Sequence, residues 1–551
     1  MARGAWEQAR ASFLAALERQ ESSEALEGLG KAAWWLNDEV TAFAAREQAY
    51  RLYRQEGDRL SAARMALHLG SDECSLHDAY ALGSGWLQRA GRLLEGLDPA
   101  PEHGWVALWN GQIAMAFGHD SASACHSAAA VDLARSLRLL PLEQLAMAQR
   151  GLALAREGGV APPVHLNRHM HAAVGIDLDC LDLLVSTCSQ LMRGWDQLRD
   201  FGAIEEWWAL LDGIPQRGPR PCVFWICRIE HAAALLWRGA WDLAEEELDA
   251  SVEALVAIRR EIAADGMARL AKVRRRRGCY KEAAALLERA EAEPLRVLTE
   301  TLILLGWAHL ALDEGDPETA RSLAEQALTS VQGANPSERL GGLELLVHAE
   351  VARGNQDRAR QALAELQHGT GSAATDGVRA STRFAEGMVA FGAGVAETAR
   401  FRFEEAVSLF ERASAHFETA QARIELAVTL SHLGDHEAAR REAAIAAKAL
   451  SDVGAAHEAD RAHARLPRED TKAERLAGSR APRPSFTSRE VEILRLVAQG
   501  QSNHAIAAQL IVSVRTVESH LSNIYDKVGA EGKVARTAAV AYGLRHGLVS
   551  T

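Results

Sequence analysis

Apolar side chains recur every three or four residues along most of the chain, and this spacing predicts amphipathic helices. From residue 239 onward, similar segments open at intervals of 33 to 47 residues. Five of them begin with a glycine: GAWDLAEEEL at Gly239, GCYKEAAALL at Gly278, GDPETARSLA at Gly315, GNQDRARQAL at Gly354 and GDHEAARREA at Gly434. A sixth segment, FRFEEAVSLF from Phe401, has the same pattern without the glycine.

These segments share a small residue at a fixed position. An alanine stands five positions after each start: Ala244, Ala283, Ala320, Ala359, Ala406 and Ala439. A glycine can end a helix in a left-handed conformation, and a small side chain lets two helices approach closely. The unit is therefore predicted to be a helical hairpin of roughly 34–40 residues. It resembles a tetratricopeptide repeat with a degenerate consensus.

The first 230 residues have helix–loop–helix patterns in poorer register, and the helical-repeat body is expected to span residues 1–465. All thirteen tryptophans lie between Trp6 and Trp307. They could line a concave binding face or fill gaps between irregular repeats. Gap filling is the favoured interpretation, because large aromatic side chains dominate protein cores.

The C-terminal part has a different organisation. Residues 466–484 are charged, contain prolines and are poor in large apolar side chains, which is typical of a linker. Thr487 and Glu490 then form a capping-box pattern at the start of a helix that Gly500 ends. Ser502 or Asn503 is expected to cap a short second helix. The predicted arrangement is helix, short helix, tight turn and a third helix.

The third helix, capped by Ser513 and stopped by Gly529, has two distinct faces. Its apolar residues fall within about 60° of one another on a helical projection, and these are Val517, Leu521, Ile524 and Val528. The opposite face carries Arg515, Ser519, Ser522 and Asp526. A short polar face of this kind suits a helix that lies in the major groove of DNA.

These features together resemble a known family. The stretch FTSREVEILRLVAQGQSNHAIAAQLIVSVRTVESHLSNIYDKVG is similar to the DNA-binding domain of LuxR-type transcription regulators, and the similarity covers about 65 residues. The resemblance implies a four-helix module over residues 485–551, with GKVARTAAVAYGLRHGL as the fourth helix. It also implies binding to double-stranded promoter DNA as a homodimer.

The resemblance assigns roles to individual positions. Three residues are expected to contact bases: Glu518, Ser519 and Ser522. Six are expected to contact the DNA backbone: Ser502, Asn503, Arg515, Thr516, Asn523 and Lys527. A lysine is common in the family where Glu518 stands, but a glutamate can accept a hydrogen bond from cytosine N4.

Composition and charge fit a division between body and tail. The 551 residues are 48% hydrophobic and 25% charged, as in ordinary soluble globular proteins, and the net charge is −13. Residues 482–551 hold eight basic and five acidic residues, so the tail is +3 and residues 1–481 are −16. The start of the chain lacks an apolar signal-peptide core, and no window of 18 residues is apolar. A cytoplasmic protein without a membrane segment is expected.

Other chemical motifs are weak. His165 and His169 have a spacing able to bind metal but lack a third ligand pattern. Cys222 and Cys227 are interpreted as core cysteines among seven free thiols. The basic run Arg274–Arg277 is expected to face solvent and the end of its helix. No phosphate-binding G-x-x-x-x-G-K-[ST] motif occurs. The chain is therefore expected to have no enzymatic activity and no cofactor.

Two functions remain open at this stage. The first is a sequence-specific transcription regulator whose body binds a protein or small-molecule signal. The second is a helical-repeat interaction scaffold whose helix-turn-helix is vestigial or binds protein. Salt-dependent DNA binding distinguishes them, because contacts to phosphates release counterions.

Overall fold

The chain is described by a computed structural model for residues 5–157, 181–213, 220–331, 336–370, 375–465, 486–528, 535–536 and 538–540. All regular secondary structure in these ranges is α-helical, which confirms the predicted all-α fold. The chain divides into two compact units, Met1–Pro467 and Arg468–Thr551. The predicted linker at 466–484 and the histidines of the HLNRHMH motif lie outside the described residues.

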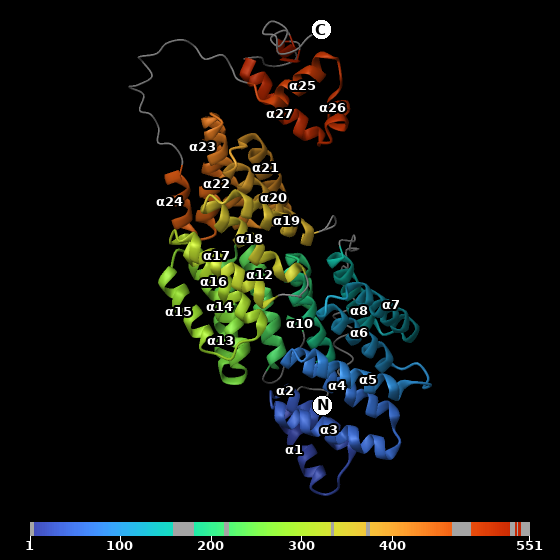
Figure 1. The fold of residues 1–551 in the computed structure, drawn as a ribbon. Coiled ribbons are helices and arrows are strands. Elements are labelled where there is room, and N and C mark those ends of the chain that lie inside the picture. The colour runs from blue at the N-terminus through green and yellow to red at the C-terminus, as the bar shows by residue number, and fades with distance from the viewer. Residues whose placement is uncertain are drawn as a thin grey trace. The chain divides into compact units, whose positions relative to one another are not determined.

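The first unit is a tetratricopeptide-like α-solenoid in which each helix packs against its neighbours in sequence (Figure 1). Its first helices are α1 (Trp6–Leu17), α2 (Ser23–Trp35), α3 (Glu39–Glu56), α4 (Arg59–His77), α5 (Tyr80–Leu94), α6 (Pro101–Ala116), α7 (Asp120–Leu137), α8 (Leu140–Arg156), α10 (Leu181–Gln197) and α11 (Phe201–Asp212). The more regular repeats contain α12 (Cys222–Trp237), α13 (Trp241–Ile258), α14 (Arg260–Arg276), α15 (Tyr280–Glu291), α16 (Val297–Asp313), α17 (Pro317–Ser330), α18 (Pro336–Ala352), α19 (Gln356–Thr370), α20 (Asp376–Gly392), α21 (Ala396–Arg412), α22 (His416–His432), α23 (His436–Asp452) and α24 (Ala456–Arg465). Among the described residues, we find no helix long and apolar enough to cross a membrane.

The turn glycines and the alanines that follow them take the predicted places. The five glycines have φ between 73° and 85°, the left-handed conformation that a turn after a helix requires. The six alanines are buried in the hairpins. The repeating hairpin predicted from the sequence is therefore confirmed.

The prediction for the segment at Phe401 was wrong in register. Phe401 lies inside α21 and is 52% exposed, whereas the turn glycine of this repeat is Gly394 with φ 77°. Ala399 and Phe403 are buried at the expected positions five and nine residues after that glycine. A shift of seven residues is about two helical turns and returns to the same face, so both registers fit the pattern.

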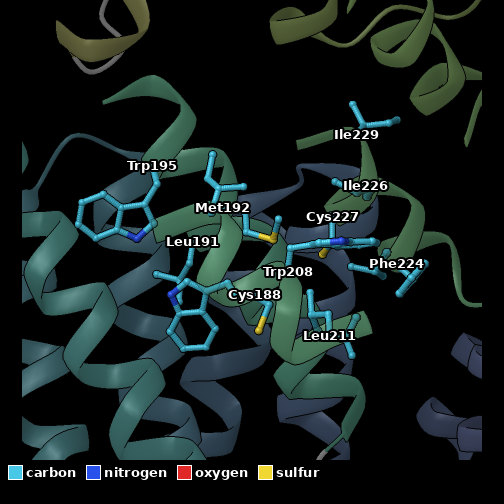
Figure 2. Close-up of a cluster of buried hydrophobic side chains, with 14 of the residues drawn as sticks. Cys188, Leu191, Met192, Trp195, Trp208, Leu211, Phe224, Ile226, Cys227 and Ile229 are labelled. Carbon is cyan, nitrogen blue, oxygen red and sulfur yellow. The ribbon is translucent and has the colours of Figure 1, made fainter. Parts of the chain in front are cut away.

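The irregular N-terminal half is held together by large side chains. Figure 2 shows Met192, Trp208 and Cys227, from α10, α11 and α12, pointing into one cluster. Ten tryptophans are buried: Trp6, Trp34, Trp35, Trp105, Trp109, Trp195, Trp207, Trp208, Trp237 and Trp241. Their burial supports the interpretation that most tryptophans fill interhelical gaps, although Trp237 also borders a cavity. The other three are half-buried.

The last repeats of the body pack back against earlier ones, and α22 contacts α12. The Trp237 indole N–H donates to the carbonyl of Ala413 at 2.8 Å. The approach is close at Gly239, where an added Cβ would lie 2.6 Å from Cγ1 of Val453. Helices that are far apart in sequence therefore enclose a space between them.

Candidate nucleic-acid interface

The second unit contains α25 (Ser488–Ala498), α26 (Asn503–Leu510) and α27 (Val514–Val528) around a small apolar core. Val517, Leu521 and Ile524 of α27 are buried in that core, as the apolar stripe predicts. Ala535 and Ala539 are buried as well, and they belong to the predicted fourth helix, of which only residues 535–536 and 538–540 are described.

Each of the three helices begins with the predicted cap. Thr487 and Glu490 form a reciprocal capping box at α25, with the Thr487 N–H donating to the Glu490 carboxylate at 2.8 Å. The Ser502 hydroxyl accepts from the backbone N–H of Ala505 at 3.3 Å, and the Ser513 hydroxyl accepts from that of Thr516 at 3.0 Å. These caps fix where α26 and α27 start.

The turn between α26 and α27 has an unusual backbone. Ile511 has φ 54° and is 92% exposed. A β-branched side chain in this left-handed conformation is strained. The guanidinium of Arg489 donates to the carbonyl of Leu510 at 3.1 Å and thereby ties the turn to α25.

The outward face of α27 presents polar groups that the domain does not use. Five side chains there are exposed and hydrogen-bond to no other described residue: Arg515, Glu518, Ser519, Ser522 and Asn523. The side chain of Asp526, also predicted on this face, is outside the described part. The face opposite the apolar stripe therefore offers one cation, one anion and three neutral hydrogen-bonding groups to a partner.

Two of the predicted backbone-contacting residues lie at helix starts. Ser502 and Thr516 are exposed, and the Thr516 hydroxyl lies 2.7 Å from that of Ser513. They stand at the N-terminal ends of α26 and α27, where the helix dipole favours a negatively charged group.

Asn503 has a structural partner that the sequence did not indicate. Its side-chain oxygen accepts from Arg536 at 2.8 Å, and the same guanidinium donates to the carbonyl of Gln501 at 2.5 Å. Arg536 thus joins the described part of the predicted fourth helix to the start of α26.

Lys527 also has a partner inside the domain. Its ammonium donates to both carboxylate oxygens of Glu490, at 2.6 and 2.9 Å. The Glu490 side chain is 4% exposed and that of Lys527 is 28% exposed. The lysine therefore neutralises the acid of the α25 capping box, besides lying on the flank of the predicted DNA-binding face.

Comparison with known proteins identifies this unit. Residues 484–540 match the family described as bacterial regulatory proteins, luxR family. They form a LuxR-type helix-turn-helix domain. The response regulator Rre1 of Synechocystis is 48% identical over 63 residues, which are 11% of this chain and 26% of that protein. LiaR of Bacillus subtilis is 39% identical over 69 residues, 12% of this chain and 31% of that protein. VraR of Staphylococcus aureus is 43% identical over 64 residues, 12% of this chain and 29% of that protein.

The LuxR-type domain is a module of DNA-binding transcription regulators, and the match spans less than a third of each relative. Solved helical proteins resemble the chain loosely. The superposition on a chain of the Cut9–Hcn1 assembly covers 98% of this chain and 93% of that one, at 14% identity and with a TM-score of 0.36. The superposition on the quorum sensor NprR of B. thuringiensis covers 78% of this chain and 98% of the NprR chain, at 12% identity and with a TM-score of 0.33.

The other motifs lie in the body, outside the LuxR-type domain. Cys222 and Cys227 are buried, and burial raises the pKa of the Cys222 thiol to about 12. Within the described ranges, no three histidine, cysteine or acidic side chains gather as metal ligands.

The basic run at the end of α14 was predicted to face solvent and the end of its helix. Two of its arginines instead form ion pairs within the body. Arg275 pairs with Asp313 at 2.8 Å, and the buried Arg276 pairs with Glu418 at 2.5 Å. The Arg275 pair joins α14 to the next repeat and the Arg276 pair joins it to a distant one, because the solenoid brings acidic side chains against the end of α14.

Proposed function

We propose that this protein is a sequence-specific transcription regulator that binds promoter DNA as a homodimer and receives a protein or small-molecule signal on its helical-repeat body. In this proposal residues 1–465 are the body, residues 466–484 are the linker and residues 485–551 bind DNA. The observation that supports it best is the outward face of α27, where five polar side chains are exposed and hydrogen-bond to no other described residue.

Sequence would be read by the centre of that face. Ser519 and Ser522 can each donate and accept a hydrogen bond at a base edge, and Glu518 can accept from cytosine. These three residues are exposed on one side of α27. A helix in the major groove brings such side chains to base edges while its buried face stays on the domain.

The rim of the face would hold the DNA backbone. Arg515 and Asn523 are exposed on α27, while Ser502 and Thr516 lie at helix N-termini. Asn503 and Lys527 each have an intramolecular partner, so a phosphate contact from either has to be shared with that partner. Contacts of this kind set register and affinity but do not distinguish sequences.

Dimeric binding predicts the form of the DNA site. A two-fold symmetric pair of domains reads two half-sites about one helical turn apart, which gives an inverted repeat. The full-length protein, incubated with random duplex DNA and carried through repeated rounds of selection, should enrich such a repeat. Enrichment of no sequence would contradict specific recognition.

The competing function is a protein-interaction scaffold. Binding isotherms with the selected duplex at several salt concentrations separate the two, because the logarithm of the binding constant falls by about 0.9 per phosphate contact per logarithm of salt. We expect a steep slope for the wild-type protein and a shallower one for Arg515→Ala. Lys448→Ala, which removes an exposed lysine of α23 in the body, is the matched control and should leave the slope unchanged. Absence of salt-dependent binding would favour the scaffold.

A further inference from the structure

The closure of the repeats leaves a cavity in the body. It has a volume of about 320 Å³ and is lined by residues of α10–α16, α18 and α20–α22. These helices are contributed by successive repeats of the body. A volume of this size is in the range of sites for small organic ligands.

One part of the wall is apolar and aromatic. Leu236 and Trp237 of α12 meet Phe410 and Phe417 from the last repeats, and Leu305 and Phe384 continue the surface. The Trp237 and Phe410 rings lie 6.1 Å apart with their planes at 64°. This wall can accommodate the hydrocarbon or aromatic part of a ligand.

The other part is basic, although the body as a whole is acidic. The lining includes five cationic side chains against three acids: Arg199, Arg269, Lys272, Arg275 and Arg276, with Asp196, Glu344 and Glu418. Four of the cations have acidic partners. Arg199 forms a bidentate ion pair with Glu344, at 2.6 and 2.7 Å. The other three arginines form ion pairs with acidic side chains at 2.5 to 2.9 Å.

Lys272 differs from the four arginines. Its side chain is exposed into the cavity and forms no ion pair or hydrogen bond within the described residues. The enclosing helices desolvate the ammonium, and this, together with the nearby Arg276 guanidinium, lowers the pKa of Lys272 to about 7. An anionic ligand would relieve both effects by supplying a counter-charge.

Arg276 adds unused donors next to Lys272. Its side chain is 5% exposed and its guanidinium stacks over the Phe417 ring at 4.2 Å. Its Nε and Nη1 atoms are buried without a hydrogen-bond partner, although buried donors are usually paired. The basic side of the cavity therefore has unmatched positive charge beside an aromatic ring.

We propose that this cavity is the signal site of the body and takes an amphipathic organic anion, whose carboxylate or phosphate contacts the Lys272 ammonium while its apolar part lies against the aromatic wall. This inference rests on the proposed function, in which the body receives a signal. It adds the place and the chemical class of that signal.

The charge on Lys272 makes binding pH-dependent. The charged or titratable groups around it are Arg276 on its own helix, Asp196 and Arg199 from the α10 end, His309 of α16 and Glu418 of α22. Burial lowers the pKa of His309 and of His348, so both imidazoles stay neutral above pH 6.5. Lys272 is protonated below its pKa, so anion affinity is full in acid and falls as pH rises through about 7, by at most about tenfold per pH unit.

The test uses the full-length protein and two fluorescent probes. Anilinonaphthalene sulfonate carries an anionic group, and N-phenylnaphthylamine is the same ring system without it. Saturable binding with a clear preference for the sulfonate is expected. Octanoate and octyl phosphate are then added as competitors, and displacement by one, the other or both shows which anion the site accepts.

Three variants locate the site. Lys272→Met should weaken sulfonate binding roughly 10- to 100-fold, as expected when a charged hydrogen bond is lost. Lys281→Met removes an exposed lysine of neighbouring α15 and should have no effect. Lys272→Arg should keep the affinity but lose its dependence on pH, because arginine does not titrate in this range.

The outcomes separate this inference from the proposed function. Equal sulfonate binding by Lys272→Met and wild type, equal affinity for the neutral probe, or displacement by neither competitor would overturn the anion site, even if promoter DNA were still bound. Anion binding without any salt-dependent DNA binding would support the cavity assignment and would instead overturn the regulator.

Discussion

Lys527→Met is expected to destabilise the LuxR-type domain through Glu490. The carboxylate of Glu490 is almost inaccessible to solvent and accepts from the Lys527 ammonium and from the Thr487 N–H. Without the lysine, one backbone donor remains to stabilise a buried negative charge. The variant therefore tests whether the main role of Lys527 is to hold the domain together.

The structure sets the magnitude of the effect. Removal of one partner from a fully buried ion pair costs about 3–5 kcal/mol. Lys527 is 28% exposed and Thr487 still donates, so we expect about 2 kcal/mol, as for a single hydrogen bond to a charged group. Glu490→Gln keeps an acceptor for Thr487 and should cost about 1 kcal/mol. The double variant Lys527→Met/Glu490→Gln should be more stable than Lys527→Met by about 1 kcal/mol, because it leaves no charge buried at position 490.

Hydrogen exchange of the full-length protein measures this, since peptides from residues 486–528 report the domain separately from the body. A loss of about 2 kcal/mol corresponds to roughly 30-fold faster exchange of the protected amides. Peptides of the body should be unchanged. Exchange within about twofold of wild type for Lys527→Met, or a double variant less stable than Lys527→Met, would refute the reasoning.

Three further comparisons test the packing. Leu521→Asp should abolish protection of the second unit because an unpaired carboxylate would be buried, whereas Ser522→Asp on the exposed face should leave it folded; the reverse result would mean that α27 faces the other way. Both Gly239→Ala and Gly315→Ala place an alanine in a left-handed turn, but only the alanine at 239 would contact another repeat. In urea unfolding followed by tryptophan fluorescence, Gly239→Ala should therefore lower the free energy of unfolding by about 1–2 kcal/mol more than Gly315→Ala does. Ile511→Gly should slow exchange in the second unit by relieving about 1 kcal/mol of backbone strain, and faster exchange would contradict that strain.

Local rules predicted the elements of the LuxR-type domain. The capping box, the serine caps and the apolar stripe depend on residues within a few positions of one another. Such local rules could not predict that Lys527 pairs with Glu490, 37 positions away, or that Asn503 pairs with Arg536, 33 positions away. Helical periodicity shows which face a side chain lies on, and Lys527 lies at the border between the faces.

The closure of the body was beyond sequence reasoning for a similar reason. Each repeat satisfies the same local pattern, while the curvature that brings Arg276 against Glu418, 142 positions away, accumulates from small rotations between repeats. The buried pair of Arg46 with Asp182, 136 positions apart, arises in the same way in the less regular half. The cavity therefore becomes visible only when the repeats are placed in space.

The central claim, that the outward face of α27 reads base sequence, is tested most directly with Ser519→Ala. Affinities are measured for the selected duplex, for single-base variants of it and for a scrambled duplex, at several salt concentrations. The account predicts an unchanged salt slope and a loss of about 1 kcal/mol, roughly fivefold, confined to one base position of each half-site. An equal loss for the selected and scrambled duplexes, or no loss at any position, would contradict it.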